Sequence, residues 1–311
     1  MTRRLIAPTF IAGTLALLAA TAAAGPTLVQ SEITTFYFGV ETVTPDPDHP
    51  DTLDNCHTDL DVPFLSCDWR PEVSPNDVPG GGDRQVDPED ALLYVNSAAR
   101  ITLGSIPPGF EFIGITPGVP FWVLPQNYAA GVLWLGFSSE TMSPADRAGL
   151  SEWDPGDPRG GANVAAKWIR IQLVDVRGPA GGNFSLWQTT GMGQADAFMS
   201  TYDGGITDVD VYHVLAGSHT HVNFGFTQPG LYEVDFRVST YLVYDRGDTD
   251  CDADVDLDDF VRLPECVGGP DEAPAPAAPV TAQNCLNWFD FDQDGDVDLA
   301  DYAVFQAAYA G

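Results

Sequence analysis

Two aspartate-rich segments near the C-terminus repeat each other, and they constrain the fold of this chain more than any other feature. Each fills a twelve-residue frame with Asp at positions 1, 3, 5, 7, 9 and 12, and the frames begin at residues 248 and 290. Calcium takes about six to eight oxygen ligands, and a loop of this length supplies them from those six positions. The sequence therefore predicts two bound calcium ions, with the ligand positions at Asp248, Asp250, Asp252, Asp254, Asp256, Asp259, Asp290, Asp292, Asp294, Asp296, Asp298 and Asp301.

The two frames differ in ways that predict different strengths. Position 7 contributes its backbone carbonyl, so the side chains of Asp254 and Asp296 add charge rather than coordination. Gly295 occupies position 6, where the loop turns sharply, but the first frame has Ala253 there, which predicts a weaker or more strained site. Both frames have valine at position 8, where an apolar residue lets paired loops associate. Without an ion, each cluster of carboxylates repels itself, so binding should be coupled to folding.

A short amphipathic helix is expected after each frame. Tyr302, Phe305 and Tyr309 fall at i, i+3 and i+7, which makes one apolar face. Phe260 and Leu263 form the equivalent apolar face after the first frame, before a proline interrupts the pattern. We therefore predict that residues 246–311 form a small all-α calcium-binding module, interrupted by an extended Pro/Ala linker at 268–279.

A tandem loop–helix repeat with Asp at position 12 resembles a dockerin-type module, and the resemblance covers residues 247–310. It implies a cohesin-like receptor, or another scaffold or cell-surface protein, as the partner. Positions 10 and 11, which carry partner choice in that family, are Leu257-Asp258 and Leu299-Ala300 here rather than the usual hydroxyl pair. The linker is also longer than usual for the family.

The N-terminus predicts export. A basic Thr2-Arg3-Arg4 start precedes an apolar run and the small residues Ala22-Ala23-Ala24, so residues 1–24 are typical of a signal peptide. No later segment has about eighteen consecutive apolar residues, so we expect no transmembrane segment in the mature chain and a secreted or cell-surface location. With 45 acidic against 13 basic residues and a net charge of -32, the chain should repel nucleic acid, which we exclude as a partner.

Five cysteines fit an oxidising compartment. From their positions along the chain we predict two disulfides, Cys56–Cys67 and Cys266–Cys285, which leaves Cys251 unpaired; other pairings are open.

Residues 25–245 are predicted to form a β-sandwich, which makes the whole chain mainly β. Short β-branched or aromatic runs alternate with Gly, Pro, Asn and Asp clusters, and no long helical period competes. The segment 45–90 has little strand character and is expected to form long loops. The predicted strands are Ile33–Val40, Ala91–Val95, Phe110–Ile115, Val132–Phe137, Val164–Val176, Asn183–Gln188, His219–Phe226 and Leu231–Tyr244.

Residues 85–245 also resemble the choice-of-anchor M domain of bacterial surface proteins. The likeness is carried by Asp90–Tyr94, Trp122–Gln126, Gly131–Gly136 and above all by the run from His219-Thr-His221 through Phe-Thr to Pro-Gly-Leu-Tyr. It implies an exported β domain displayed at the surface, with no activity to transfer.

His219 and His221 alternate on one predicted strand, so both imidazoles should point to the same side, which suits a transition metal. His213, His57 or His49 are candidates for a further ligand, with Asp208 or Asp210 nearby in sequence. The alternative is that both histidines hydrogen-bond to loop backbone.

The favoured function is therefore non-catalytic: an exported β domain displayed or assembled outside the cell through its calcium module. The alternative is a polysaccharide-degrading enzyme or a carbohydrate-binding module. Acidic pairs that join Glu140 or Glu152 with Asp154 would suit a glycosidase. Sugar-stacking candidates are Trp122, Trp134, Trp153, Trp168 and Trp187. The serine-hydrolase and zinc-protease motifs are absent.

Overall fold

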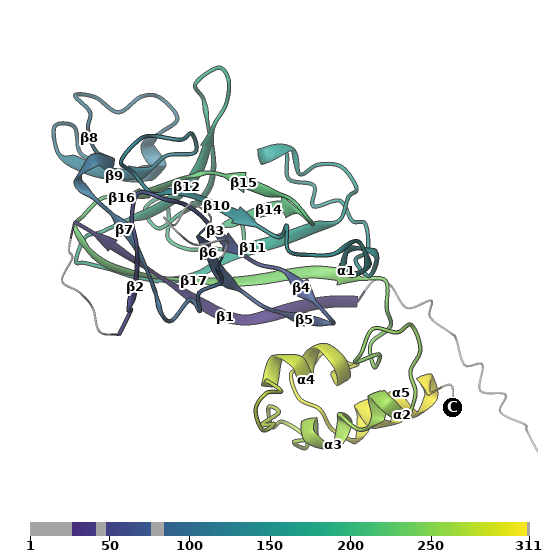
Figure 1. Cartoon of the computed structure of the whole chain (residues 1–311). Coiled ribbons are helices and arrows are strands. Elements are labelled where there is room, and N and C mark those ends of the chain that lie inside the picture. The colour runs from purple at the N-terminus through teal and green to yellow at the C-terminus, as the bar shows by residue number, and fades with distance from the viewer. Residues whose placement is uncertain (1–26, 42–47, 76–83, 310–311) are drawn as a thin grey trace, which may run out of the picture.

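The computed structural model describes residues 27–41, 48–75 and 84–309, and Figure 1 shows the whole chain. The predicted signal peptide, residues 1–24, lies outside the described residues. As predicted, the chain is mainly β, and its strands form several sheets.

The strands alternate with short 3-10 and α-helical turns until residue 242, and α-helices follow. The strands are β1 (Thr27–Val40), β2 (Asp51–Leu53), β3 (His57–Asp61), β4 (Phe64–Leu65), β5 (Asp68–Trp69), β6 (Glu72–Pro75), β7 (Ala91–Val95), β8 (Arg100–Thr102), β9 (Pro120–Leu124), β10 (Trp134–Ser138), β11 (Trp168–Arg177), β12 (Phe184–Thr189), β13 (Ala195–Ser200), β14 (Val211–Leu215), β15 (His219–His221), β16 (Asn223–Phe226) and β17 (Gly230–Leu242). The helices are η1 (Ser97–Ala99), η2 (Glu111–Ile113), α1 (Pro144–Ala148), η3 (Arg159–Gly161), α2 (Leu257–Phe260), α3 (Leu263–Cys266), α4 (Ala282–Phe289) and α5 (Leu299–Ala308).

Three larger sheets and one hairpin hold these strands. The six-stranded sheet has the order β14-β11-β17-β1-β7-β2, the five-stranded sheet β13-β12-β16-β9-β8, and the four-stranded sheet β15-β10-β3-β6. β1 and β17 pair antiparallel, whereas β1 pairs with β7 and β10 pairs with β3 in parallel. The hairpin joins β4 and β5.

Aromatic rings fill the space between the sheets. Phe38 of the six-stranded sheet packs 5.1 Å from Phe226 of the five-stranded sheet, measured between ring centroids. Phe236, also from the six-stranded sheet, meets Phe137 of the four-stranded sheet edge to face at 5.7 Å. Burial of such rings removes large apolar areas from water, so this shared core holds the three sheets together.

Most predicted strands are present, but His219–Phe226 is two strands in different sheets, and the predictions for Phe110–Ile115 and for the segment 45–90 are wrong. Phe110–Ile115 is not a strand; it contains the 3-10 turn η2, which ends at Gly114 in a left-handed conformation (φ 74°). Its apolar side chains resemble a strand pattern, yet Phe112 and Ile113 are buried in a separate cluster with Trp187. The segment 45–90 is also not all loop, since its described part contains β2 to β6. Those strands are short and rich in polar residues, so they lack the apolar alternation that sequence reading requires.

The disulfide prediction was right for Cys266–Cys285 and wrong for Cys56–Cys67. Cys67 bonds Cys251 instead, 184 residues away in sequence. The extended strands β3 and β4 separate Cys56 from Cys67, and the chain after β17 returns Cys251 to the β4–β5 turn. Cys56 Sγ contacts Thr58 Oγ1 at 3.2 Å.

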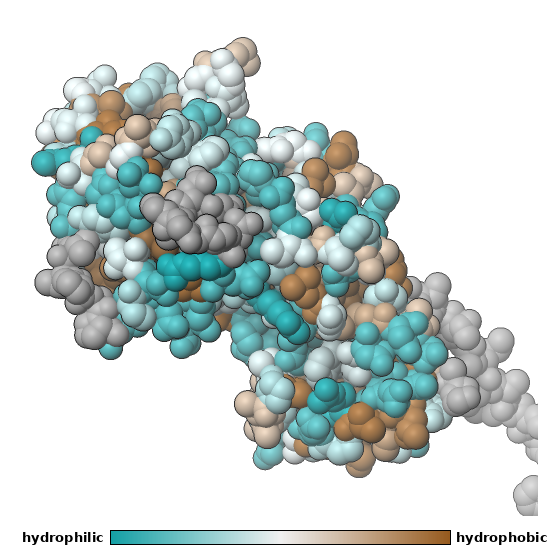
Figure 2. All heavy atoms as spheres, viewed as in Figure 1, coloured by the Kyte–Doolittle hydropathy of each residue, from teal (hydrophilic) through white to brown (hydrophobic). Residues whose placement is uncertain are grey.

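The helices α2 to α5 lie together beside the β sheets, below β1 and β5 in Figure 1. They have their own core, in which Phe289 and Phe305 are fully buried. Asn287 of α4 joins this part to β1, because its amide donates to Gln30 O at 2.7 Å and accepts from Gln30 N at 3.1 Å. Figure 2 shows hydrophobic residues at the surface of this helical part.

Candidate metal sites

The two aspartate frames form loops at equivalent places in the helical part. The first loop (248–259) runs from the chain after β17 into α2, and the second loop (290–301) joins α4 to α5. The structure gathers every predicted ligand except Asp252 into clusters whose carboxylate oxygens lie within 4.8 Å of one another. The clusters are Asp248, Asp250 and Asp259; Asp254, Asp256 and Asp259; Asp290, Asp292 and Asp294; and Asp296, Asp298 and Asp301.

Both loops use the position 1 aspartate to fix the turn. Asp248 accepts hydrogen bonds from the backbone N–H groups of Asp252 and Ala253, at 3.2 and 3.0 Å. Asp290 accepts the equivalent pair from Asp294 and Gly295, both at 3.2 Å. The same turn is thus built twice from the same residue type at the same spacing.

The position 12 aspartate closes each loop. Asp259 Oδ2 accepts from Asp256 N at 2.8 Å and Asp301 Oδ2 accepts from Asp298 N at 2.9 Å. Each of these position 9 residues also caps the following helix with its own side chain. The carboxylate that would complete a calcium shell is therefore tied to the start of the helix.

Positions 6 and 8 of the two loops have the conformation and burial that the sequence indicates. Ala253 has φ 81° and Gly295 has φ 95°, so both occupy the left-handed region, where only the glycine is free of a Cβ penalty. The position 8 valines, Val255 and Val297, are buried together in the core of the helical part.

Several carboxylates of the helical part are buried, so their negative charge needs a compensating cation. Asp259 and Asp301 are each only 1% exposed. Asp296 is buried as well, and its Oδ1 has no hydrogen-bond partner among the described residues. Burial, with a smaller contribution from the neighbouring Asp259 carboxylate, raises the pKa of Asp248 to about 6. Hard oxygen donors that are crowded and dehydrated in this way fit calcium, which compensates their charge directly.

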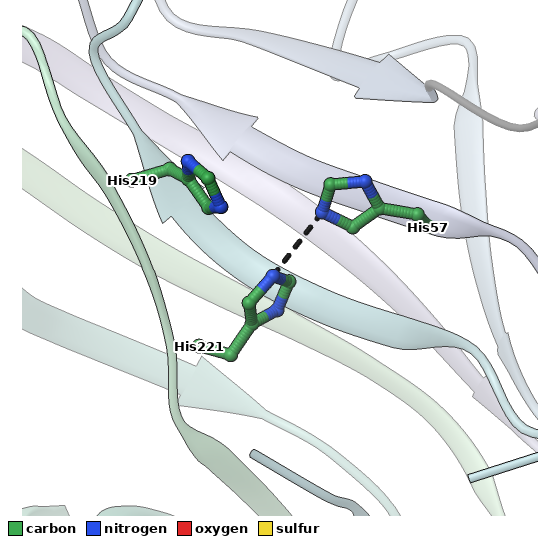
Figure 3. Close-up of side chains that lie close together, drawn as sticks. All are labelled: His57, His219 and His221. Carbon is green, nitrogen blue, oxygen red and sulfur yellow. Dashed lines mark hydrogen bonds between the residues drawn. The ribbon is translucent and has the colours of Figure 1, made fainter. Parts of the chain in front are cut away.

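A second, chemically different cluster lies on the four-stranded sheet. His219 and His221 extend from β15 to the same side, as predicted, and of the three further histidine candidates the structure brings His57 of β3 to them. Figure 3 shows one ring nitrogen of each imidazole facing the space between the three rings. His57 Nε2 lies 3.1 Å from His221 Nε2, and one nitrogen of each histidine lies within 4.8 Å of the others.

Carboxylates flank the three histidines. Glu140 Oε1 lies 3.0 Å from His219 Nδ1, and this contact raises the pKa of His219. Asp59 Oδ2 lies 3.5 Å from His57 Nε2, and burial raises the pKa of Asp59 to about 7. Burial lowers the pKa of His221 to about 4, so this imidazole is neutral at physiological pH.

The other sequence candidates lie elsewhere. His213 contacts Trp153 and Trp168, with its Nδ1 3.7 Å from Asp157 Oδ2. His49 packs against Tyr37. Asp210 accepts a hydrogen bond from Ser200 N, and Asp208 is exposed. None of these four belongs to a metal-competent cluster among the described residues.

Sequence reasoning missed Asp59 and the place of Glu140 beside His219. The alternation His57-Thr-Asp59-Leu-Asp61 is the signal that a strand was present, because all three polar side chains point to one face.

Three of the five tryptophans suggested for sugar stacking are core residues. Trp122, Trp168 and Trp187 are 4–5% exposed, so they present no ring face to a ligand. Trp134 is half-buried, and His221 stacks on its ring with centroids 3.9 Å apart.

Within the described residues, no helix is both long enough and apolar enough to cross a membrane. Comparison with protein-family models, curated proteins and solved structures finds no match for this chain.

Proposed function

We propose that this chain is an exported, non-catalytic calcium-binding protein. Its C-terminal dockerin-like module binds two calcium ions and attaches or assembles the β domain outside the cell. The β domain is the displayed part, in line with its resemblance to the choice-of-anchor M domain.

The observation that carries the proposal is the agreement between the two loops. They are separated by α2, α3 and α4, yet each has the same backbone turn, the same position 1 and position 12 hydrogen bonds, and buried carboxylates at those two positions. Burial of a carboxylate without compensation costs several kcal/mol. An acidic surface segment that binds no ion is therefore not expected to bury aspartates twice in the same geometry.

The proposed attachment surface lies beside the loops. Leu257 and Leu299, each at position 10 of its loop, are 59% and 78% exposed. Phe260, Tyr302 and Tyr309 line a groove of about 290 Å³ next to Leu257. Position 10 is one of the two positions at which the dockerin resemblance expects partner contacts, and the apolar character of the two leucines and of the adjacent groove favours a partner with an apolar face.

Calcium-dependent folding is the first test. The full-length chain, stripped of metal with a chelator, should gain helical far-UV circular dichroism when calcium is added, and amides of residues 247–309 should become protected from hydrogen exchange. Asp259→Asn should abolish the protection in the first loop. Asp258→Asn is the matched control, since Asp258 is an exposed loop aspartate outside the acidic clusters. Absence of any calcium response would rule out the proposal.

Partner binding is tested with immobilised cohesin domains in calcium and in chelator. We expect calcium-dependent binding that Leu299→Asp removes without changing calcium affinity. If no cohesin binds while calcium still folds the module, the partner is a different surface protein. Calcium-independent retention on an insoluble polysaccharide would instead favour the carbohydrate-binding alternative.

A further inference from the structure

The three histidines meet across an intervening strand. In the four-stranded sheet β10 lies between β3 and β15, with Trp134 opposite His57 and Gly136 opposite both Asp59 and His221. Neighbouring strands are about 4.8 Å apart, so side chains from β3 and β15 touch only if β10 leaves the space above it open.

Gly136 leaves that space. A Cβ at this position would lie 2.5 Å from Asp59 Oδ1, 2.7 Å from Thr220 O and 3.0 Å from His221 Nδ1. Any larger residue would therefore push the Asp59 and His221 side chains away. Trp134 bounds the space on one side, with its ring almost parallel to His221 at an interplanar angle of 12°.

The nitrogen spacing matches shared coordination. Two nitrogens held by one tetrahedral zinc at about 2.0–2.1 Å lie roughly 3.3–3.4 Å apart. His57 Nε2 and His221 Nε2 are 3.1 Å apart, so little movement would place both on one ion.

The buried carboxylate beside the histidines also favours binding of a cation. The Asp59 side chain is 4% exposed, and its Oδ1 has no hydrogen-bond partner among the described residues. No lysine or arginine forms an ion pair with it in the described part of the chain. Glu140 holds His219 through Nδ1, the type of carboxylate–histidine contact that orients metal ligands through the opposite nitrogen.

We propose that His57, His219 and His221 bind one transition-metal dication of the zinc class, independently of the calcium loops. Imidazole nitrogens suit zinc, copper or nickel rather than calcium. Three protein ligands leave a fourth coordination position for water or an exogenous oxygen or nitrogen ligand. Asp59 supplies buried negative charge beside the ion, and Glu140 is a positioning residue that acts through His219.

The test is zinc binding by the metal-stripped full-length chain in saturating calcium, which keeps the acidic loops filled. Competition with a chromophoric chelator should give one zinc per chain, and cobalt should give the visible absorption of a tetrahedral nitrogen site. His219→Ala is the key variant, because the His219 side chain is 37% exposed and its loss should not disturb folding. We expect at least 100-fold weaker zinc binding for this variant and about 10-fold weaker binding for Glu140→Gln.

His213→Asn is the control, since it removes a histidine outside the cluster and should bind zinc like the natural chain. Circular dichroism and thermal melts of each variant establish that it folds. The proposal is overturned if the natural chain takes up no zinc once calcium is saturating, or if folded His219→Ala binds zinc with unchanged affinity.

Discussion

The two aspartate loops differ at position 6, where the backbone conformation carries a measurable cost for one of them. Ala253 adopts φ 81°, whereas its counterpart in the second loop is Gly295. A Cβ in the left-handed region costs about 1 kcal/mol. The Asp ligand positions are the same in both loops, so position 6 should account for much of the difference in affinity.

We therefore expect Ala253→Gly to tighten calcium binding at the first loop by about fivefold, the equivalent of about 1 kcal/mol. Gly295→Ala is the reciprocal variant and should weaken the second loop by a similar factor. Calorimetric calcium titration of both variants measures the effect. Equal affinities in the natural chain and in both variants would refute the role given to this position.

His213 gives a prediction for pH. Burial lowers its pKa to about 4, while an unfolded chain has the ordinary value near 6.5. The unfolded state therefore binds more protons between these values, so the stability gained from a neutral His213 is present above pH 6.5 and is lost as pH falls toward 4.

His213→Asn should remove this loss. Relative to the variant, the natural chain should lose about 1.4 kcal/mol per pH unit within that window and then level off. Urea unfolding of both proteins at several pH values, in saturating calcium, provides the measurement. Parallel stability curves from pH 7 to pH 4 would show that His213 titrates normally.

At the scale of elements, the stability of helix α5 should depend on the one face that packs against α4. Phe305 is 1% exposed and packs edge to face on Phe289 of α4, with ring centroids 5.6 Å apart, whereas Tyr309 is 41% exposed. The i, i+3, i+7 pattern grouped Phe305 and Tyr309 on one face, but only the first is in the core.

Phe305→Ala should cost about 3–5 kcal/mol, the usual cost of a buried Phe truncation, and should weaken calcium binding because folding and binding are coupled. Tyr309→Ala, the matched control, should change stability by no more than about 0.5 kcal/mol. Denaturant unfolding in calcium distinguishes them. A Phe305→Ala variant as stable as the control would show that α5 is not held through this contact.

Elements with strong local signals were predictable, and those with weak ones were not. Ala91–Val95 agrees with β7 at both ends, and the aspartate spacing marks the two loops in which the structure clusters carboxylates. β3 was missed because His57, Asp59 and Asp61 gave it a polar face, and that same face carries the third histidine. The run His219–Phe226 predicts one strand, but the chain passes from the four-stranded sheet to the five-stranded sheet between β15 and β16.

At the scale of the whole molecule, the Cys67–Cys251 disulfide connects the β domain to position 4 of the first calcium loop. No local pattern encodes this pairing, because it depends on how the sheets bring the β4–β5 turn beside the end of β17. Asn284 and Asn287 of α4 add contacts to Asp68 and Gln30. The helical part is therefore docked on the β domain rather than attached by the chain alone.

Removal of this disulfide should loosen the first loop selectively. In Cys67→Ser/Cys251→Ser we expect several-fold weaker calcium binding and faster hydrogen exchange at residues 248–259, with the second loop unchanged, because the bond fixes position 4 of the first loop to the β4–β5 turn. Cys266→Ser/Cys285→Ser is the comparison variant and should affect the helical part as a whole. Equal effects on both loops would argue against selective docking.

The central claim is that this module binds two calcium ions through two equivalent loops. Isothermal calorimetry of the metal-stripped full-length chain should give a stoichiometry of two, falling to one in Asp259→Asn and in Asp301→Asn and remaining two in Asp258→Asn. A natural chain that binds no calcium, or loop variants that still bind two ions as tightly, would contradict it.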